Sequence, residues 1–166
     1  MNQKLFFEEM IQAARQACNQ IESVDFRDPS SLLTTLIDLL RCADVLSHCS
    51  IQDESEKLVI VSDDYSSRLT NIPEDFVFHG TFDPLDATSV CSNTLKDCLG
   101  DIYSSLKGGL IVLDKEPPKK LSVLWEWQSD YKSHWGRHLI DVIRFLILCQ
   151  NIEKTVVRGK NGSVVS

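Results

Sequence analysis

Apolar residues recur at steps of three and four along most of the chain, a spacing that places them on one face of an α-helix. The first such run predicts a helix over residues 3–23. A second run predicts a helix that Asp28 caps, with Pro29 at its first position, and that ends near residues 47–50. Aspartate can cap a helix and proline is favoured at its first position, so this pair is a strong start signal.

Two more helices are predicted in the second half of the chain. One is expected from Ser92, its capping residue, to about Leu113, and a longer one over 119–152. Pro117 and Pro118 interrupt the pattern between them. Such a short connection makes two consecutive helices antiparallel neighbours.

The middle of the chain is less regular. Residues 58–70 begin with strand-forming side chains, but their apolar positions continue at helical steps, so we predict a helix there. Residues 71–91 contain Pro73, Gly80 and Pro84 and few periodic positions. This segment is expected to be a long irregular loop, a kind of loop that often carries function.

Four to five helices with mostly short connections and no clear strand pattern predict an all-α fold, an antiparallel up-and-down bundle. The bundle is expected to form a single domain over residues 1–155. The last residues, 156–166, lack periodicity towards their end and are expected to form a flexible tail.

The composition suits one globular domain, since 43% of the 166 residues are hydrophobic and 25% are charged. The net charge of -7 argues against binding of nucleic acid or of an anionic membrane, which both need a basic face. No apolar run approaches the ~20 residues that span a bilayer. Glu8 and Glu9 interrupt the N-terminal segment, so no signal peptide is expected either.

A cytoplasmic location follows from these expectations, and it agrees with the pattern of cysteines. The chain has six cysteines without a C-x-x-C pair. A chain of this size has enough core to fold without disulfides, so the thiols are expected to be reduced and structural. The oligomeric state is left open by the sequence.

Residues 134–141, H-W-G-R-H-L-I-D, carry the candidate chemistry of the last helix. On a wheel of about 100° per residue, His134 lies about 40° from Asp130. Trp127 and His138 follow at about 60° and about 80°, whereas the apolar positions centre near about 150°. This stripe is therefore expected beside the core, with His138 closest to it.

Histidines four residues apart on one helical face can hold one metal ion, because their rings converge. His134 and His138 are therefore candidate ligands of a divalent transition metal, with Asp130 as a carboxylate that would complete the site. Trp135 stands where the metalloprotease motif has its glutamate, so that motif is not matched. The alternative is structural, because a histidine beside a core often just hydrogen-bonds a neighbouring helix.

The preceding helix offers two carboxylates, Asp97 and Asp101, which come level with the histidines if the two helices are antiparallel. The wheel places Asp97 on the solvent side, almost opposite the apolar stripe, so Asp101 is the better candidate. The sequence contains no phosphate-binding glycine loop, no G-x-S-x-G and no zinc-finger spacing. Complete catalytic machinery of these types is therefore absent.

Several motifs together resemble a family of small bacterial proteins that is known only as a domain of unknown function. They are D-C-L-G-D-I-Y-S-S-L-K-G-G-L at 97–110, W-E-W at 125–127 and H-W-G-R-H at 134–138, with an F-D-P turn at 82–84. The resemblance covers residues 76–146 and implies an all-α up-and-down bundle. The motif positions that it implies are Asp101, Tyr103, Lys107, Trp125, Trp127, His134, Trp135 and His138.

The leading interpretation is a non-enzymatic binding or interaction module without a cofactor, which recognises an unknown protein or small ligand in a groove beside the last helix. The residues expected to line this groove are Trp127, His134, Trp135, His138, Asp101, Tyr103 and Phe82. One alternative is a metal-binding protein or metal-dependent hydrolase that uses His134 and His138. Another is a subunit or immunity-type protein that binds a larger protein partner.

Overall fold

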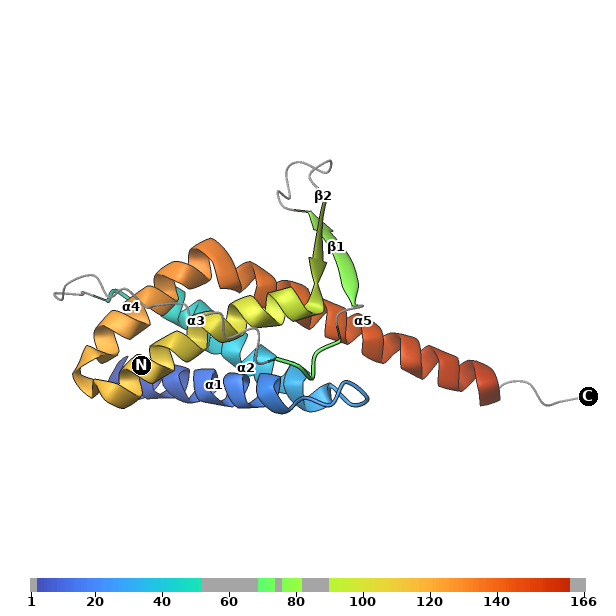
Figure 1. Ribbon diagram of the computed structural model, residues 1–166, viewed down its shortest axis with the longest axis horizontal. Coiled ribbons are helices and arrows are strands. Elements are labelled where there is room, and N and C mark those ends of the chain that lie inside the picture. The colour runs from blue at the N-terminus through green and yellow to red at the C-terminus, as the bar shows by residue number, and fades with distance from the viewer. Residues whose placement is uncertain (1–2, 52–68, 74–75, 82–89, 162–166) are drawn as a thin grey trace, which may run out of the picture.

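The computed structural model describes residues 3–51, 69–73, 76–81 and 90–161 (Figure 1). Most of these residues lie in helices packed around one hydrophobic core, so the predicted all-α bundle is confirmed. The α-helices of the described chain are α1 (Gln3–Ser23), α2 (Ser30–Ser47), α3 (Leu95–Lys115), α4 (Lys120–Asp130) and α5 (Gly136–Asn161).

Helix α1 has the predicted bounds, and α2 ends within the predicted range but begins at Ser30, one residue after the predicted first position, because Pro29 is its N-cap residue. One face of each helix is completely buried. Met10 and Ile21 are examples from α1, and Leu36 is an example from α2. The Oδ1 atom of Asp28 accepts a hydrogen bond of 3.2 Å from the backbone N–H of Ser30, the first residue of α2. This bond satisfies one of the donors that a helix start leaves free.

A two-stranded hairpin lies between α2 and α3 in the chain. Its strands, β1 (Val77–Thr81) and β2 (Val90–Thr94), pair antiparallel, with Val77 opposite Thr94 and Thr81 opposite Val90. Figure 1 shows the hairpin rising away from the bundle. The prediction of an irregular loop over 71–91 is therefore wrong at β1 and at the start of β2. The predicted helix over 58–70 falls almost entirely outside the described residues.

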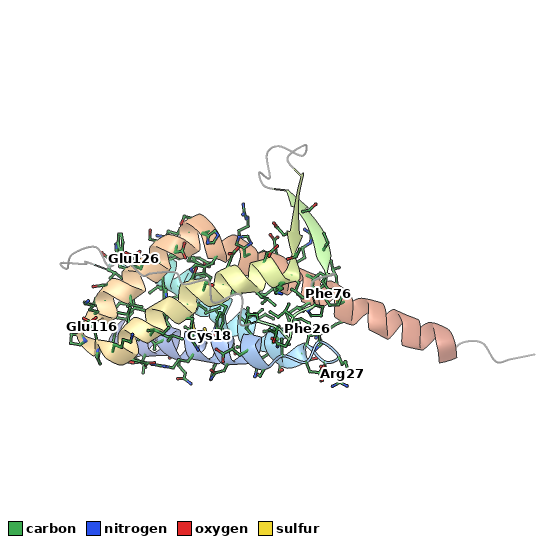
Figure 2. All side chains as sticks on the ribbon, viewed as in Figure 1. Cys18, Phe26, Arg27, Phe76, Glu116 and Glu126 are labelled. Atoms are coloured by element: carbon green, nitrogen blue, oxygen red, sulfur yellow. The ribbon has the colours of Figure 1, made fainter. Side chains whose placement is uncertain are left out.

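The base of the hairpin is attached to the bundle by Phe76. Its ring centroid lies 6.2 Å from that of Phe26, and Figure 2 shows the two side chains at the same end of the molecule. The ring centroid of Phe76 also lies 5.5 Å from that of Phe145 on α5. The carbonyl of Phe76 also accepts a hydrogen bond of 2.8 Å from the backbone of Leu95. Through Phe76, the base of the hairpin therefore contacts the loop before α2, the start of α3, and α5.

Strand β2 leads directly into α3, which changes the start of that helix from the prediction. Thr94, and not Ser92, caps it: the Oγ1 atom of Thr94 accepts a hydrogen bond of 3.0 Å from the N–H of Asp97. Ser92 is instead paired with His79 across the hairpin. Thr94 is the cap in place of the predicted Ser92 because Ser92 belongs to the paired strand β2.

The predicted last helix is interrupted by a π-helical turn, η3 (Tyr131–Trp135), which joins α4 to α5. In this turn the N–H of Gly136 bonds the carbonyl of Tyr131, five residues earlier. A Cβ atom on Gly136 would lie 2.4 Å from that carbonyl oxygen and 2.8 Å from Cδ2 of the Tyr131 ring. Glycine is therefore required at this position. A short 3-10 turn, η2 (Pro117–Lys119), precedes α4.

At its other end, α5 continues to Asn161 and extends past the rest of the bundle (Figure 1). The predicted helix ended at Ile152, and residues 156–161 of the predicted tail continue the helix. None of the helices in the described part of the chain is long and apolar enough to cross a membrane.

The contact between α3 and α4 is built around Trp127. Its side chain is 1% exposed, and its Nε1 atom donates a hydrogen bond of 3.1 Å to the carbonyl of Ser105. A Cβ atom on Gly109 would lie 2.5 Å from that Nε1 atom and 2.6 Å from Cε2 of the indole. Gly109 therefore provides the space that the indole occupies on α3.

The contact between α1 and α3 includes a small polar cluster. The Tyr103 hydroxyl donates a hydrogen bond to Oε1 of Glu22, and the Lys107 ammonium donates to the same oxygen at 2.8 Å. Both donors lie on one face of α3, four residues apart. Burial is the main reason that the pKa of Tyr103 is raised to about 12, so its hydroxyl remains a donor at neutral pH.

Two side-chain amides hold the chain on either side of residues 52–68. Gln128 of α4, which is almost fully buried, donates hydrogen bonds to the carbonyls of Leu46 and Cys49, the latter at 2.8 Å. Asn71 donates to the carbonyls of Ile21 and Val24 at 3.4 and 3.3 Å. The end of α2 and the chain at residue 71 are thus attached to the bundle.

Candidate functional site

Asp101, His134 and His138 converge on one side of the bundle, where α3 faces η3 and α5. One ligand atom from each of the three lies within 4.8 Å of those of the others. The Oδ2 atom of Asp101 is 3.3 Å from Nε2 of His138 and 3.8 Å from Nε2 of His134. The two imidazole rings meet edge to face, with centroids 5.0 Å apart. The sequence predicted both histidines and identified Asp101 as the better of the two α3 carboxylates.

These three side chains differ in their exposure to solvent. The side chain of His138 is 8% exposed, whereas those of Asp101 and His134 are 43% and 46% exposed. His138 is thus the inner residue of the group, as the wheel predicts, and the other two lie at the surface. The group is therefore accessible from solvent through Asp101 and His134.

The electrostatics of His138 follow from this position. Burial lowers the pKa of the His138 imidazole below its ordinary value of 6.5, because a charged ring loses hydration there. The carboxylate of Asp101 opposes this effect and the neighbouring His134 adds to it. The ring of His138 is therefore neutral at pH 7, the form in which imidazole binds metals.

This lowered pKa makes the stability of the metal-free protein depend on pH. The unfolded chain takes up a proton at His138 near pH 6.5, whereas the folded chain takes it up only at lower pH. The free energy of unfolding is therefore expected to fall as the pH is lowered through 6.5 towards the pKa of the folded state. Urea denaturation with EDTA at about pH 7.5 and about pH 5.5 measures this change.

The matched variant for that experiment is His138→Gln, whose amide does not titrate. Its free energy of unfolding should change less between the two pH values than that of the wild-type protein. Equal changes in the two proteins would mean that other groups carry the pH dependence.

Cys98 contacts the second nitrogen of the His138 ring. Its Sγ atom lies 3.2 Å from Nδ1, on the opposite side of the ring from Asp101. Cys98 is completely buried, and burial is the main reason that the pKa of its thiol is raised to about 12. The thiol is therefore protonated at neutral pH. The row Cys98–His138–Asp101 has the residue types of a nucleophilic triad but lacks the accessible thiolate that such chemistry needs.

Asp130, the predicted third metal ligand, lies on the other side of His134. Its Oδ1 atom is 3.8 Å from Nδ1 of His134, while Nε2 of the same ring faces Asp101. Asp101 is thus the carboxylate that faces Nε2 of both histidines, whereas Asp130, the predicted carboxylate, faces the other nitrogen of His134.

The aromatic residues predicted to line a groove lie in the core. Trp127, Trp135 and Tyr103 are each at most 1% exposed. Nε1 of Trp135 is buried and has no hydrogen-bond partner within the described part of the chain. Phe82, the remaining predicted aromatic residue, lies outside the described residues. The structure thus brings together Asp101, His134 and His138 from the predicted groove and places the three aromatic side chains elsewhere.

The residue that the sequence reasoning missed is Cys98. The cysteines are predicted to be reduced and structural, and the contact of Cys98 with Nδ1 of His138 was not predicted. The spacing held a signal, since Cys98 and Asp101 are three residues apart and share one face of α3. A buried cysteine three residues before Asp101 on the helix can contact the other nitrogen of the histidine ring that Asp101 contacts.

A separate hollow of 390 Å³ lies between α1 and α2, and it contains none of the residues predicted to line a groove. It is lined by Leu5, Glu8, Glu9, Gln12, Ala13, Gln16, Asp38, Arg41 and Cys42. The convergent histidines are therefore not part of this hollow.

A comparison with family models tests the resemblance to a family of unknown function. The family described as a domain of unknown function, DUF5063, matches residues 2–150. The chain belongs to the DUF5063 family. The resemblance to a domain-of-unknown-function family is thereby confirmed. No curated protein and no solved structure matches the chain.

The DUF5063 match contains the whole candidate site. It extends from the start of α1 to residue 150 within α5, so the described bundle and hairpin lie inside it. The part of α5 that extends past residue 150 lies outside the DUF5063 match. The family description names no activity.

Proposed function

We propose that the protein binds a divalent first-row transition metal ion through Asp101, His134 and His138. The observation that carries this proposal is the convergence of their ligand atoms within 4.8 Å. Imidazole nitrogens and a carboxylate oxygen are the ligand atoms that zinc, iron and manganese accept in proteins. The neutral ring of His138 is ready to act as a ligand without loss of a proton.

The spacing of the three side chains supports one shared ion. Two ligand atoms at about 2.1 Å from an ion are about 3.0 Å apart at a right angle and about 3.4 Å apart at a tetrahedral angle. The distance of 3.3 Å between Asp101 Oδ2 and His138 Nε2 is within this range. The distance of 3.8 Å to Nε2 of His134 is slightly longer, and rotation of that half-exposed ring would shorten it.

Three protein ligands leave at least one coordination position for water or a small ligand. Because Asp101 and His134 are half-exposed, this position would face solvent. Asp130 supports the proposal as well, since ligand histidines usually have a carboxylate or a carbonyl near their second nitrogen. A metal bound in this way would be exchangeable and open to a further ligand.

The metal-binding alternative is favoured over the groove interpretation because the aromatic side chains expected to form the groove are in the core. Recognition of a protein or small ligand, a role as a subunit or immunity-type protein, and a cytoplasmic bacterial setting remain predictions. An open metal position at the surface is compatible with each of them.

Metal content tests the proposal directly. Full-length protein without an affinity tag would be stripped with EDTA, dialysed against Zn²⁺, Mn²⁺ or Fe²⁺, and analysed for metal. We expect about one equivalent of at least one of these ions. Binding well below one equivalent with all three ions would contradict the proposal.

Two aspartate variants of α3 make a matched comparison. Asp101→Asn should weaken metal binding by more than the roughly 10–100-fold that changes of outer groups cause. Asp97→Asn removes an exposed carboxylate one turn earlier on the same helix and should bind metal like the wild-type protein. Equal affinities in the two variants would show that the metal binds elsewhere.

A further inference from the structure

The imidazole of His138 is held from both sides by one helix. Asp101 lies 3.3 Å from Nε2, and Cys98 lies 3.2 Å from Nδ1. Both partners come from α3, three residues apart. The sulfur of Cys98 faces Nδ1, whereas Asp101 faces Nε2, and Cys98 is not among the residues whose ligand atoms converge, so it is not placed to bind the same ion. Its contact is with the ring, not with the metal position.

The two nitrogens of a neutral imidazole have different roles, since one carries the proton and the other a lone pair. Without metal, the carboxylate of Asp101 favours the proton on Nε2, and Nδ1 then needs a donor. With metal on Nε2, the proton must lie on Nδ1, which then needs an acceptor. A thiol is a weak donor and a weak acceptor, so it can serve in both cases.

We propose that Cys98 is a positioning residue of the metal site, which holds the His138 ring and supports both of its tautomers. With a metal ion held by Nε2, the ring proton would lie on Nδ1, and this N–H would donate a hydrogen bond to Sγ. The thiol keeps its own proton and turns it away from the ring, so no proton is gained or lost in the exchange. This inference rests on the proposed metal binding for its second state and on the observed Cys98–His138 contact for its first.

Cysteine variants test this role. Cys98→Ala removes donor and acceptor together and should weaken Zn²⁺ binding by about 10–100-fold, as is usual for loss of an outer partner. Cys98→Ser keeps a group that both donates and accepts, so its Zn²⁺ affinity should stay near that of the wild-type protein. Cys42→Ala, which removes a buried thiol from α2, controls for loss of core packing. Competition with a chelator measures all four affinities.

Two results would overturn the inference while leaving metal binding intact. One is a Cys98→Ala protein that binds Zn²⁺ as tightly as Cys42→Ala. The other is a Cys98→Ser protein that loses as much affinity as Cys98→Ala, because this would indicate a packing role. Failure of the wild-type protein to bind any metal would instead remove the proposed function.

A measurement without metal tests Cys98 independently. Nitrogen-15 NMR of the His138 ring in the metal-free protein should show one tautomer, with the proton on Nε2, in the wild-type and Cys98→Ser proteins. Cys98→Ala should show a larger share of the tautomer with the proton on Nδ1, because Nδ1 has lost its donor and Asp101 alone is left to favour the proton on Nε2. The same tautomer ratio in Cys98→Ala as in the wild-type protein would contradict the inference whether or not the protein binds Zn²⁺.

Discussion

Replacing Gly136 with alanine should lower the free energy of unfolding by about 1–3 kcal/mol, although alanine is about 1 kcal/mol better than glycine in an ordinary helix. The new Cβ atom would lie 2.4 Å from the carbonyl oxygen of Tyr131 and 2.8 Å from its ring. A backbone carbonyl inside a helix cannot move aside without changing the π-helical turn. Chemical denaturation followed by circular dichroism would measure the loss.

Ser133→Ala is the matched control for this variant. Ser133 is exposed in the same turn, and its hydroxyl donates a hydrogen bond to the carbonyl of Ser129. We expect a change within about 0.5 kcal/mol for this control. Gly136→Ala should also weaken Zn²⁺ binding, because the turn sets the relation of His134 to His138. A Gly136→Ala protein as stable as the wild type would show that the turn relaxes easily.

Replacing Trp127 with alanine should lower the free energy of unfolding by about 3–5 kcal/mol, the usual range for removal of a large buried aromatic side chain. Trp127 is 1% exposed and packs directly against α3 at Gly109. Its loss would also leave the carbonyl of Ser105 without the indole donor. A single domain is stable by about 5–15 kcal/mol, so this variant would be near its folding limit at 25 °C.

A double-mutant cycle separates the close contact from the general loss of core. Gly109→Ala alone should destabilise the wild-type protein, because its Cβ atom would lie 2.5 Å from Nε1 of Trp127. In the Trp127→Ala background the same change should be neutral or stabilising by up to about 1 kcal/mol, since the space is free and alanine favours helix. Additive effects of the two changes would show that Gly109 and Trp127 do not compete for space.

The helices whose apolar face decides their structure could be predicted from sequence. Helix α1 has the predicted bounds, and α2 begins directly after the predicted Asp28–Pro29 signal. Both depend on local spacing and on the side chains at their ends, which are properties of short segments. The depth order of His134 and His138 was predicted for the same reason, because it depends on angles within one short stretch.

The hairpin could not be predicted in the same way. Its strands contain Gly80, Ser92 and Asn93, and neither has the strict alternation of apolar and polar residues that indicates a half-buried strand. Their identity as strands depends on cross-strand pairing, such as that of His79 with Ser92, which no single segment reveals. The same pairing removed Ser92 from its predicted role as a helix cap.

The buried position of Trp127 could not be predicted from the helical wheel, which assumes about 100° for every residue. The π-helical turn at Tyr131–Trp135 adds a residue to one turn, so angles measured across it are shifted. The wheel therefore placed Trp127 beside the core. Gly136 was the signal for this turn that the sequence contained. The space that a Cβ atom would need at Gly136 is occupied by Tyr131, in the preceding turn.

The amide anchors at Gln128 and Asn71 attach the chain to the bundle at two points between α2 and the hairpin. Gln128 donates to the carbonyls of Leu46 and Cys49, and Asn71 donates to those of Ile21 and Val24. An ionised carboxyl group has no N–H to donate, so glutamate at 128 or aspartate at 71 would place a negative charge against two carbonyl oxygens. Replacing either amide by the acid of the same size would therefore weaken the attachment of the chain at that point.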